Sequence, residues 1–476
     1  MSSPYVNSSP QNRVLTQHFF RRLADKGFVT EQTIRQFYSE VDERFLPDRY
    51  VVGTCPRCAD PAARGDQCER CSSLLDPEDL ISPRSALSGS ADLQLRPTRH
   101  LFLRTDALAG EVRRWIDGHE ADWSHLVLSV ARKWLHEGLK PRCITRDLSW
   151  GVPVPRAGFE DKVFYVWFDA PVGYIGATRE WADREPARRD YREWWCDASG
   201  ARYVQFMAKD NLPFHTIFFP AMVLGTREPW MLPAYIKGLH WLTYYGGKFS
   251  TSRRRGVFLD QALALYGPDY WRYALLSMAP ESDDADFTWE RFAAVVNQDL
   301  VGIIGNLVQR VLTLSAREFG PQVPGGGEGG EAERRLTAAC EATLAEYVAA
   351  LRAIELRRAV RALRELWSLG NRYLDARAPW TLVRHDREQA ALVLRTAIGL
   401  IRLCAAAASP VIPFAASRVA EALGVAEADA DLWRGRIRLD TPAAGQPFSV
   451  PAPLFSRVTD ADVARLQAAY PAAGPE

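Results

Sequence analysis

The sequence lacks any strong excess of charge. Its 476 residues include 59 Lys+Arg and 58 Asp+Glu, which gives a formal net charge of +1. Charge alone therefore indicates neither a nucleic-acid nor a membrane partner, and a nucleic-acid site would have to be a local patch. Hydrophobic residues make up 47% and charged residues 25%, which excludes a disordered, collagenous or coiled-coil chain. At roughly 150 residues per domain, the length predicts about three domains.

Cysteine is also sparse, and no targeting segment is apparent. Eight cysteines in 476 residues are too few for a secreted disulfide scaffold. The first residues, MSSPYVNSSPQN, lack the apolar centre of a signal peptide. The most apolar stretch, residues 397–416, contains Arg402, Pro410 and Pro413, which favours a buried helix over a membrane span. We therefore expect a soluble, cytoplasmic protein with no membrane contact.

Several common catalytic motifs are absent. The sequence contains no GxGxxG, HExxH or GxSxG, and its eight histidines do not cluster at metal-ligand spacing. These absences argue against a dehydrogenase, a metalloprotease and an α/β-hydrolase.

Two apolar runs predict buried strands. VFYVWF at 163–168 is bounded by charged residues, and YVQFM at 203–207 is a second such run. Runs of this kind suit strands that are covered on both faces. The second is followed by Asp210 or Asn211 as a helix cap, with Pro213 in the first turn. This rhythm predicts an open parallel α/β sheet.

Other segments have helical periodicity. Residues 13–26 and 106–140 show apolar side chains at helical spacing, and from about 290 to 440 only helical patterns occur. The glycine-rich stretch at 325–331 is interpreted as a flexible linker. The chain should therefore combine an α/β part with an all-helical part.

Four cysteines occur as two closely spaced pairs. Cys55-x2-Cys58 and Cys68-x2-Cys71 could wrap one tetrahedral Zn²⁺, which would stabilise a segment too small to fold alone. Four protein ligands leave no open position, so such a site would be structural. The alternatives are two redox pairs or coincidence. Packing roles are expected for the remaining four: Cys143, Cys196, Cys340 and Cys404.

The ends of the two predicted strands carry aromatic and polar residues. In open α/β sheets, ligands bind beyond the carboxyl ends of the strands. An apolar box with a carboxylate at its edge and a nearby histidine suits a small amino acid with an apolar side chain. Packing in the core is the alternative for each residue alone. The residues are Trp167, Asp169, Ala170, Pro171, Tyr174, Lys209, Asp210, Phe214 and His215.

A glycine-led basic loop runs from Gly246 to Arg255. Backbone N–H groups, hydroxyls and cations of this kind could close over a polyphosphate. A solvated basic turn is the alternative. The loop is not a Walker A motif, because Phe249 stands where that motif needs Ser or Thr.

In this order, the segments resemble the methionyl-tRNA synthetase family of class I aminoacyl-tRNA synthetases, especially the bacterial branch with a single four-Cys knuckle. The resemblance covers nearly the whole chain. The motifs that carry it are FLPDRYVVGTCPRC (45–58), GDQCERC (65–71), RDLSWGVPVP (146–155), FYVWFDAPVGYI (164–175), AKDNLPFHT (208–216), GGKFSTS (246–252) and NRYLDARAPW (371–380).

The resemblance implies roles for the basic loop. Lys248, Ser250, Thr251 and Ser252 would be the KMSKS-like catalytic loop. Lys248, Thr251 and Arg253 would bind ATP, whose counter-ion is Mg²⁺. Thr251 replaces the second lysine of that signature, and Arg253 or Arg254 would supply the missing charge.

The resemblance also implies three binding sites. The four paired cysteines would hold the structural zinc. Asn306 and Arg310, four residues apart on one helical face, and Trp380, which could stack on a base, would read the CAU anticodon of tRNA(Met). Methionine would be bound by Trp167, Ala170, Pro171, Tyr174, Asp210, Phe214 and His215.

The implied fold is α/β plus all-α: a partial class I Rossmann catalytic domain with a zinc-knuckle insertion, followed by a helical anticodon-binding bundle. The expected division is a remnant of the first Rossmann half (1–25), the connective insertion (26–140), the second Rossmann half (141–245), the KMSKS-like loop and stem-contact region (246–295), the anticodon-binding domain (296–460) and a tail (461–476).

The sequence departs from the family in one respect. The first half of the Rossmann fold, with its His-Ile-Gly-His signature, is not found in it. We therefore expect a monomeric methionine–tRNA ligase in a truncated or split form, whose missing half a separate chain could supply. One alternative is a catalytically incomplete paralogue that binds tRNA. Another is a biosynthetic relative that transfers an activated amino acid to a small acceptor.

Overall fold

The computed structural model describes residues 9–65, 68, 71, 75–197, 200–251, 254–426, 430–435 and 437–472. The chain divides into two compact units, Met1–Gly238 and Leu239–Glu476. The first combines helices with small sheets, and the second is dominated by helices. This arrangement confirms the predicted fold class.

The first unit opens with the expected amphipathic helix, α1 (Pro10–Asp25). The Ser9 hydroxyl accepts a hydrogen bond from the Asn12 N–H, and Pro10 occupies the first turn. The predicted helical segment at 106–140 is two helices, because the chain turns between Gly118 and Ser124, the latter capping the second. The other helices of this unit are α2 (Thr105–Asp117), α3 (His125–Glu137), α4 (Val166–Asp169), α5 (Gly173–Asp183), α6 (Arg192–Trp195) and α7 (Phe219–Thr226).

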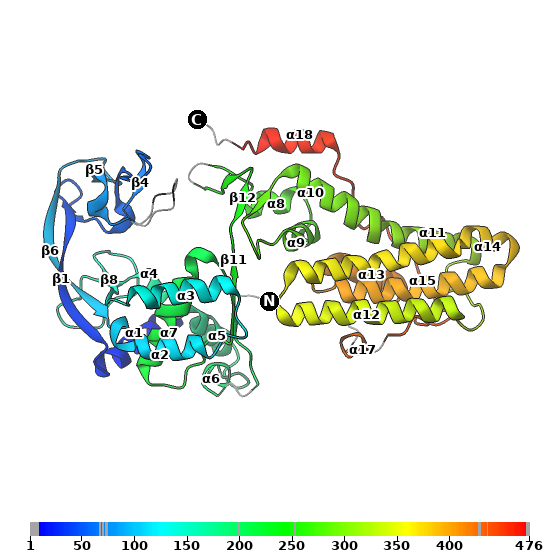
Figure 1. Ribbon diagram of the computed structural model, residues 1–476, viewed down its shortest axis with the longest axis horizontal. Helices are drawn as coiled ribbons and strands as arrows, with labels where there is room; N and C mark the ends of the chain where they lie inside the picture. Colours follow the sequence, from blue (N-terminus) through cyan, green and yellow to red (C-terminus); the bar gives the residue numbers. More distant parts are fainter. Residues whose placement is uncertain are drawn as a thin grey trace. The chain divides into compact units, whose positions relative to one another are not determined.

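A long two-stranded ribbon organises the rest of this unit. β1 (Val29–Ser39) and β6 (Leu93–Leu103) are antiparallel along their whole length. In Figure 1 the ribbon runs from the helices to a small sheet that carries the paired cysteines. At its margins lie β2 (Arg44–Phe45) and β7 (Arg142–Cys143), and the small sheet consists of β3 (Val51–Thr54), β4 (Ala63–Arg64) and β5 (Ile81–Ser85).

The strand predicted at 163–168 is wrong for most of its length. Only β9 (Val163–Phe164) is extended, paired with β8 (Thr145–Arg146), and the chain then turns into α4. An apolar run this short does not distinguish a strand from a buried helical turn. Phe164 and Phe168, four residues apart, stack with ring centroids 4.9 Å apart inside the core.

The second predicted strand is confirmed as β10 (Val204–Ala208), which pairs with β11 (Tyr235–Leu239). The helix cap predicted at Asp210 or Asn211 is wrong. A 3₁₀ turn (Lys209–Asn211) and a π-helical turn (Phe214–Phe218) lead into α7 instead. The 3₁₀ turn is tighter than an α-helix and the π-helical turn is wider. Both contain residues that were predicted to contact a ligand.

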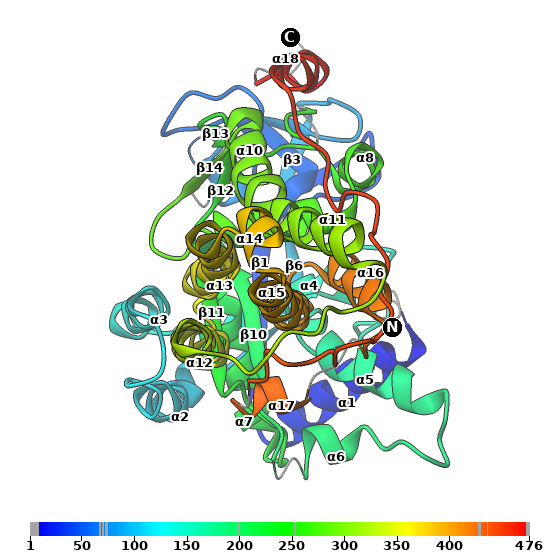
Figure 2. The same ribbon diagram turned by 90° about the vertical axis from the view of Figure 1, so that its right-hand side faces the viewer.

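The second unit confirms the helical prediction for 290–440 within its described residues. Its long helices lie side by side in Figure 1 and are seen nearly end-on in Figure 2. These are α11 (Asn306–Phe319), α12 (Glu331–Ala353), α13 (Leu356–Arg377) and α15 (Arg387–Ala408). The shorter ones are α8 (Leu259–Leu265), α9 (Pro268–Ser277), α10 (Trp289–Val295), α14 (Pro379–His385), α16 (Pro413–Leu423), α17 (Ala430–Trp433) and α18 (Asp460–Ala469). A small sheet contains β12 (Leu242–Tyr244), β13 (Gly247–Lys248) and β14 (Ala285–Phe287).

Helix α15 is the centre of this unit. It is long and apolar enough to cross a membrane, but 89% of its most apolar window is buried, which is typical of the core helix of a soluble bundle. A Cβ atom on Gly399 would lie 2.1 Å from the Leu439 carbonyl oxygen. Only glycine therefore allows the segment 437–448 to cross the helix at this point.

The glycine-rich stretch predicted as a flexible linker is packed against α15. The Arg395 guanidinium donates to the carbonyl oxygens of Gly326 (3.0 Å) and Gly327 (2.6 Å). Gly326 has φ +88° and lies against the backbone of Leu392. The sequence pattern identified a loop without repetitive structure, but these hydrogen bonds hold it in place.

Candidate functional site

Two of the predicted ligand-binding aromatic residues line one cavity. Trp167, on α4, stacks on Phe214, with ring centroids 3.7 Å apart and an interplanar angle of 9°. The cavity beside them has an empty volume of about 330 Å³, which includes space open to solvent. Its other lining residues are Leu103, Arg142, Cys143, Ile144, Tyr165, Phe168, Phe218 and Met222.

Tyr174 and His215 form a hydrogen-bonded pair from α5 and the π-helical turn. The His215 Nδ1–H donates to the Asn211 carbonyl oxygen at 3.0 Å, so Nε2 is left as an acceptor for the Tyr174 hydroxyl at 2.8 Å. Burial lowers the pKa of His215, and burial also raises the pKa of Tyr174. The imidazole is therefore neutral and the phenol protonated near neutral pH, which suits contact with an uncharged group.

The remaining predicted pocket residues surround this pair unevenly. Pro171 is buried, Ala170 is half-buried and Asp210 is exposed in the middle of the 3₁₀ turn. Trp167 and Phe214 share the cavity, whereas Tyr174 and His215 share a hydrogen bond. The structure thus brings the seven residues together as two contacting pairs and their neighbours along the chain.

Asp169, one of the carboxylates predicted at the edge of the apolar box, is a buried carboxylic acid. It is 7% exposed, and its Oδ1 has no hydrogen-bond partner among the described residues. Burial raises its pKa to about 7, although backbone N–H groups of Asp169 and Ala170 oppose the rise. A carboxyl group in this state titrates near neutral pH, which is common at functional sites. Its position directly after an apolar run was the available signal.

The predicted phosphate-binding loop begins as a tight hairpin. Tyr245 and Gly246 connect β12 to β13 with positive φ values of 46° and 74°, as a two-residue turn of this kind requires. The Gly246 N–H donates to Asp286 at 2.8 Å. The Lys248 ammonium lies over the Trp241 ring, 4.4 Å from its centroid, which positions this cation.

The distal part of the loop folds back on itself. Ser250 and Arg255 exchange backbone hydrogen bonds of 3.0 and 2.9 Å, which leaves Thr251 and Arg254 exposed at the tip. Ser252 and Arg253 lie outside the described residues. The Arg255 guanidinium donates to the Tyr244 and Tyr245 carbonyl oxygens at 2.8 and 3.2 Å. Arg255 therefore anchors the loop, a role that its place in a run of three arginines did not reveal.

The paired cysteines converge on one point. All four Sγ atoms lie within 4.8 Å of one another, with Cys55–Cys71 at 3.7 Å and Cys58–Cys68 at 3.6 Å. In a tetrahedral site with Zn–S bonds of about 2.3 Å, the sulfurs are about 3.8 Å apart. The Arg57 N–H also donates to the Cys55 sulfur at 3.4 Å. The sulfur geometry fits one structural Zn²⁺.

Two of the three predicted anticodon-reading residues are in contact. The Arg310 guanidinium lies over the Trp380 ring at 5.0 Å and pairs with Asp375 at 2.9 Å. Trp380 follows Pro379 at the start of α14 and is 40% exposed. Asn306 is exposed one helical turn before Arg310 on α11. An exposed aromatic face with an adjacent cation and amide is suited to an unstacked base.

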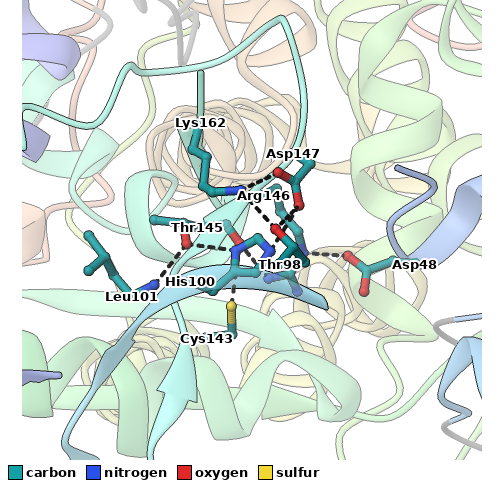
Figure 3. Close-up of polar contacts among 9 residues, drawn as sticks. All are labelled: Asp48, Thr98, His100, Leu101, Cys143, Thr145, Arg146, Asp147 and Lys162. Carbon is teal, nitrogen blue, oxygen red and sulfur yellow. Dashed lines mark hydrogen bonds and ion pairs between the residues drawn. The ribbon is translucent and has the colours of Figure 1, made fainter. Parts of the chain in front are cut away.

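One of the residues expected to have only a packing role lies in a polar cluster. Cys143, on β7, lines the cavity and faces His100 of β6, as Figure 3 shows. His100 is hydrogen-bonded to Thr145 and Asp147, both at 2.9 Å. The strands that join these residues were not predicted, so this neighbourhood was not expected from the sequence.

Comparison with known families gives two matches that together span most of the chain. A family described as tRNA synthetases class I (M) matches residues 5–312. A family described as the anticodon binding domain of methionyl tRNA ligase matches residues 323–474. The expectation of a missing first half, with a partner chain that supplies it, finds no support in these two matches.

Similar proteins carry consistent names. The chain is 53% identical over 469 residues to a methionine–tRNA ligase of Streptomyces avermitilis, covering 96% of this chain and 82% of that protein. It is 52% identical over 464 residues to methionine–tRNA ligase 1 of Acaryochloris marina, covering 97% and 83%. A methionyl-tRNA synthetase from Mycobacterium tuberculosis, solved with methionyl-adenylate, has the same fold with a TM-score of 0.72 and 22% identity over 95% of this chain and 82% of that one.

Proposed function

This chain belongs to the methionyl-tRNA synthetase family of class I, a family of ligase enzymes, and from this premise we propose that it joins methionine to tRNA(Met) at the expense of ATP. In the first step, the methionine carboxylate attacks the α-phosphate of ATP and releases pyrophosphate. In the second, the methionyl group passes to the tRNA. Neither of the alternatives, a non-catalytic paralogue or a biosynthetic relative, is favoured by the names of the similar proteins.

The observation that carries the proposal is the neutral His215–Tyr174 pair next to the Trp167–Phe214 stack. A thioether is apolar, with a polarisable sulfur that contacts aromatic rings favourably. An imidazole that stays neutral leaves this sulfur with an uncharged neighbour. Ala170 and Pro171 would close the apolar side of the pocket, and the exposed Asp210 carboxylate would face the substrate's ammonium group.

The loop around Lys248 is proposed to bind ATP. Adenylate formation requires in-line positioning and neutralisation of phosphate charge more than covalent help. Lys248 would supply charge, and the Ser250, Thr251 and Ser252 hydroxyls would supply hydrogen bonds. Thr251 stands where the family signature has its second lysine. Arg254, which is exposed near Thr251, and Arg253 are candidates to supply the positive charge of that lysine. Mg²⁺ would act as the counter-ion of the nucleotide.

Two further sites complete the proposal. Asn306, Arg310 and Trp380 would read the CAU anticodon, with a base stacked on the exposed indole. Cys55, Cys58, Cys68 and Cys71 would hold a structural Zn²⁺ that stabilises the loops between β3 and β5. The six-part domain division given above, a monomeric state and a cytoplasmic location also remain proposals.

Pyrophosphate exchange tests this function directly. The full chain, loaded with zinc, is incubated with ATP, labelled pyrophosphate and methionine, and charging of a CAU tRNA transcript is measured in parallel. We expect exchange with methionine and not with leucine or isoleucine. Lys248→Ala should lower exchange by about a hundredfold, the typical cost of one preorganised charge-stabilising group.

A matched lysine provides the control. Lys133 is an exposed residue of α3, and Lys133→Ala should exchange like the wild type. His215→Ala should raise the KM for methionine far more than the KM for ATP. Equal exchange with methionine and leucine would refute the assignment of the pocket, and the absence of both exchange and charging would refute the proposed activity.

A further inference from the structure

Cys143 lines a cavity and has charged side chains around it. It lies on β7 opposite Phe102 of β6, and its thiol donates to the Thr145 carbonyl oxygen at 3.4 Å. The side chain also lines the cavity of about 330 Å³ that contains Trp167 and Phe214. A small molecule in that cavity would therefore reach the sulfur.

His100 beside it is hydrogen-bonded through both ring nitrogens. Its Nε2 is 2.9 Å from the Asp147 carboxylate, and its Nδ1 is 2.9 Å from the Thr145 hydroxyl. That hydroxyl oxygen already accepts the Leu101 N–H at 3.1 Å. Both ring nitrogens therefore have hydrogen-bonding neighbours, and the Asp147 carboxylate accepts from Nε2–H, in a site where the imidazole is only 1% exposed. Burial opposes protonation, but the hydrogen bonds to Asp147 and Cys143 outweigh it and raise the pKa of His100.

The charges around the thiol favour its anion. The cations nearby are Lys162, which pairs with Asp147, and Arg146, which pairs with Asp48 at 2.7 Å. Arg142 adds a third, with its guanidinium 4.9 Å from the centroid of Phe218. With His100 protonated, the cations of this neighbourhood (His100, Lys162, Arg146 and Arg142) outnumber its carboxylates (Asp147, Asp48 and, near Arg142, Asp76), so a thiolate brings the cluster closer to neutrality.

The neighbouring charges and hydrogen bonds lower the pKa of the Cys143 thiol. Burial alone would raise the pKa of Cys143, but the hydrogen bond from His100 and the charge of Arg146 more than offset it, and the pKa is lowered. Cys196 offers the contrast, because it is also half-buried but its pKa is raised by burial. A thiolate that is accessible from a cavity is the nucleophilic form of cysteine.

We propose that Cys143 is a reversible oxidation site for hydroperoxides, and that its oxidation closes the amino-acid pocket. The thiolate attacks one peroxide oxygen, an S–O bond forms and the O–O bond breaks. Sulfur loses two electrons, the O–O bond takes them up, and the departing hydroxide or alkoxide is protonated by water. A low-molecular-weight thiol reverses the change: it displaces water to form a mixed disulfide, and a second thiol releases Cys143.

The consequence for the pocket rests on the function proposed above. The sulfenic acid places a polar hydroxyl on the wall of the cavity that holds the Trp167–Phe214 stack. An apolar methionine side chain would then have to leave that hydroxyl without a partner. Methionine binding should weaken after oxidation and recover after treatment with a thiol.

Site-resolved labelling tests the proposal. The zinc-loaded full chain is treated with hydrogen peroxide and dimedone at neutral pH, and adducts are quantified by mass spectrometry at Cys143 and Cys196. We expect Cys143 to react at least about tenfold faster, because thiolate character governs the rate. His100→Asn should bring Cys143 down to the rate of Cys196. The buried Cys340 and Cys404 should stay unmodified and so report that the variant is folded.

Repeating the labelling in the presence of methionine tests the oxidation site and the methionine pocket separately. If Cys143 reacts no faster than Cys196, the oxidation site is refuted. If Cys143 reacts faster and methionine slows it without affecting Cys196, both proposals are supported. If Cys143 reacts faster but methionine gives no protection, the oxidation site stands and the methionine pocket is wrong. Peroxide treatment should leave the methionine affinity of Cys143→Ser unchanged, whereas it should lower the methionine affinity of the wild type.

Discussion

Removing the Trp380 indole should weaken recognition of a CAU anticodon by a predictable amount. Base–aromatic stacking contributes about 1–3 kcal/mol per base. In the free protein, one face of the ring is covered by Arg310 at 5.0 Å, an exposed cation–π contact that is worth about 0.5–1 kcal/mol. A base that takes this face must displace the guanidinium. The net loss in Trp380→Ala should therefore be about 1–2 kcal/mol, or roughly five- to thirtyfold in Kd.

The assay is fluorescence anisotropy with a labelled anticodon stem-loop, read at one fixed ionic strength because salt alone changes such affinities. Trp380→Phe should retain most of the binding, because it keeps an aromatic face. Arg310→Ala should uncover the ring and remove one cation, so the salt dependence of binding should become shallower. Trp194→Ala is the matched control, because Trp194 is an exposed tryptophan of the other unit, at 51% exposure.

The loss of affinity in Trp380→Ala should be selective for the CAU anticodon. Trp380→Ala should lower the affinity for CAU more than that for a stem-loop with a changed anticodon. If Trp380→Ala binds both stem-loops as the wild type does, the indole does not stack on a base. If it weakens both equally, the contact carries no anticodon information.

Three other perturbations follow from the structure. Cys58→Ala should abolish the bound zinc and increase protease cleavage within residues 50–75, measured by elemental analysis and limited proteolysis; full zinc occupancy would contradict the four-sulfur site. Burial raises the pKa of Asp169 from 3.8 to about 7, so its protonated form stabilises the native state and that contribution is lost as pH rises from about 4 to 7. Asp169→Asn should therefore lose less stability than the wild type over this range in thermal denaturation, and parallel curves would contradict the buried acid. Gly399→Ala should cost about 1–3 kcal/mol of unfolding free energy through overpacking, whereas Gly110→Ala, where a Cβ meets no atom within 4 Å, should cost nothing in the same urea titration.

The parts of the molecule that follow local rules could be predicted from the sequence. Apolar spacing over residues 13–26 predicted helix α1, which begins three residues earlier at Pro10, and the cysteine spacing alone predicted sulfurs that the structure brings within 4.8 Å of one another. The helices of the second unit have long apolar stripes, and their pattern was sufficient. In each case the signal lies within one segment of the chain.

The features that could not be predicted depend on contacts between distant segments. β6 pairs with β1 across more than fifty residues of sequence and with β7 on its other side, and the pairing with β7 brings His100 next to Cys143 and Asp147. The run at 163–168 became a helical turn because Phe164 and Phe168 pack on the same core, which periodicity over six residues does not reveal. The resemblance to a family named candidate pocket residues, but not the cavity that Cys143 shares with two of them, Trp167 and Phe214.

The central position of α15 has a consequence during translation. The helix is buried on nearly all sides, and the segment 437–448 crosses it at Gly399, where Arg402 donates to the Thr441 and Arg438 carbonyl oxygens at 3.3 and 3.0 Å. That segment leaves the ribosome about forty residues after the helix ends, a delay of about 2–8 s at ordinary elongation rates. Until then, the nascent chain contains an apolar helix of 22 residues that the segment 437–448 does not yet cover. We therefore expect a ribosome-associated chaperone to bind the nascent chain during this interval.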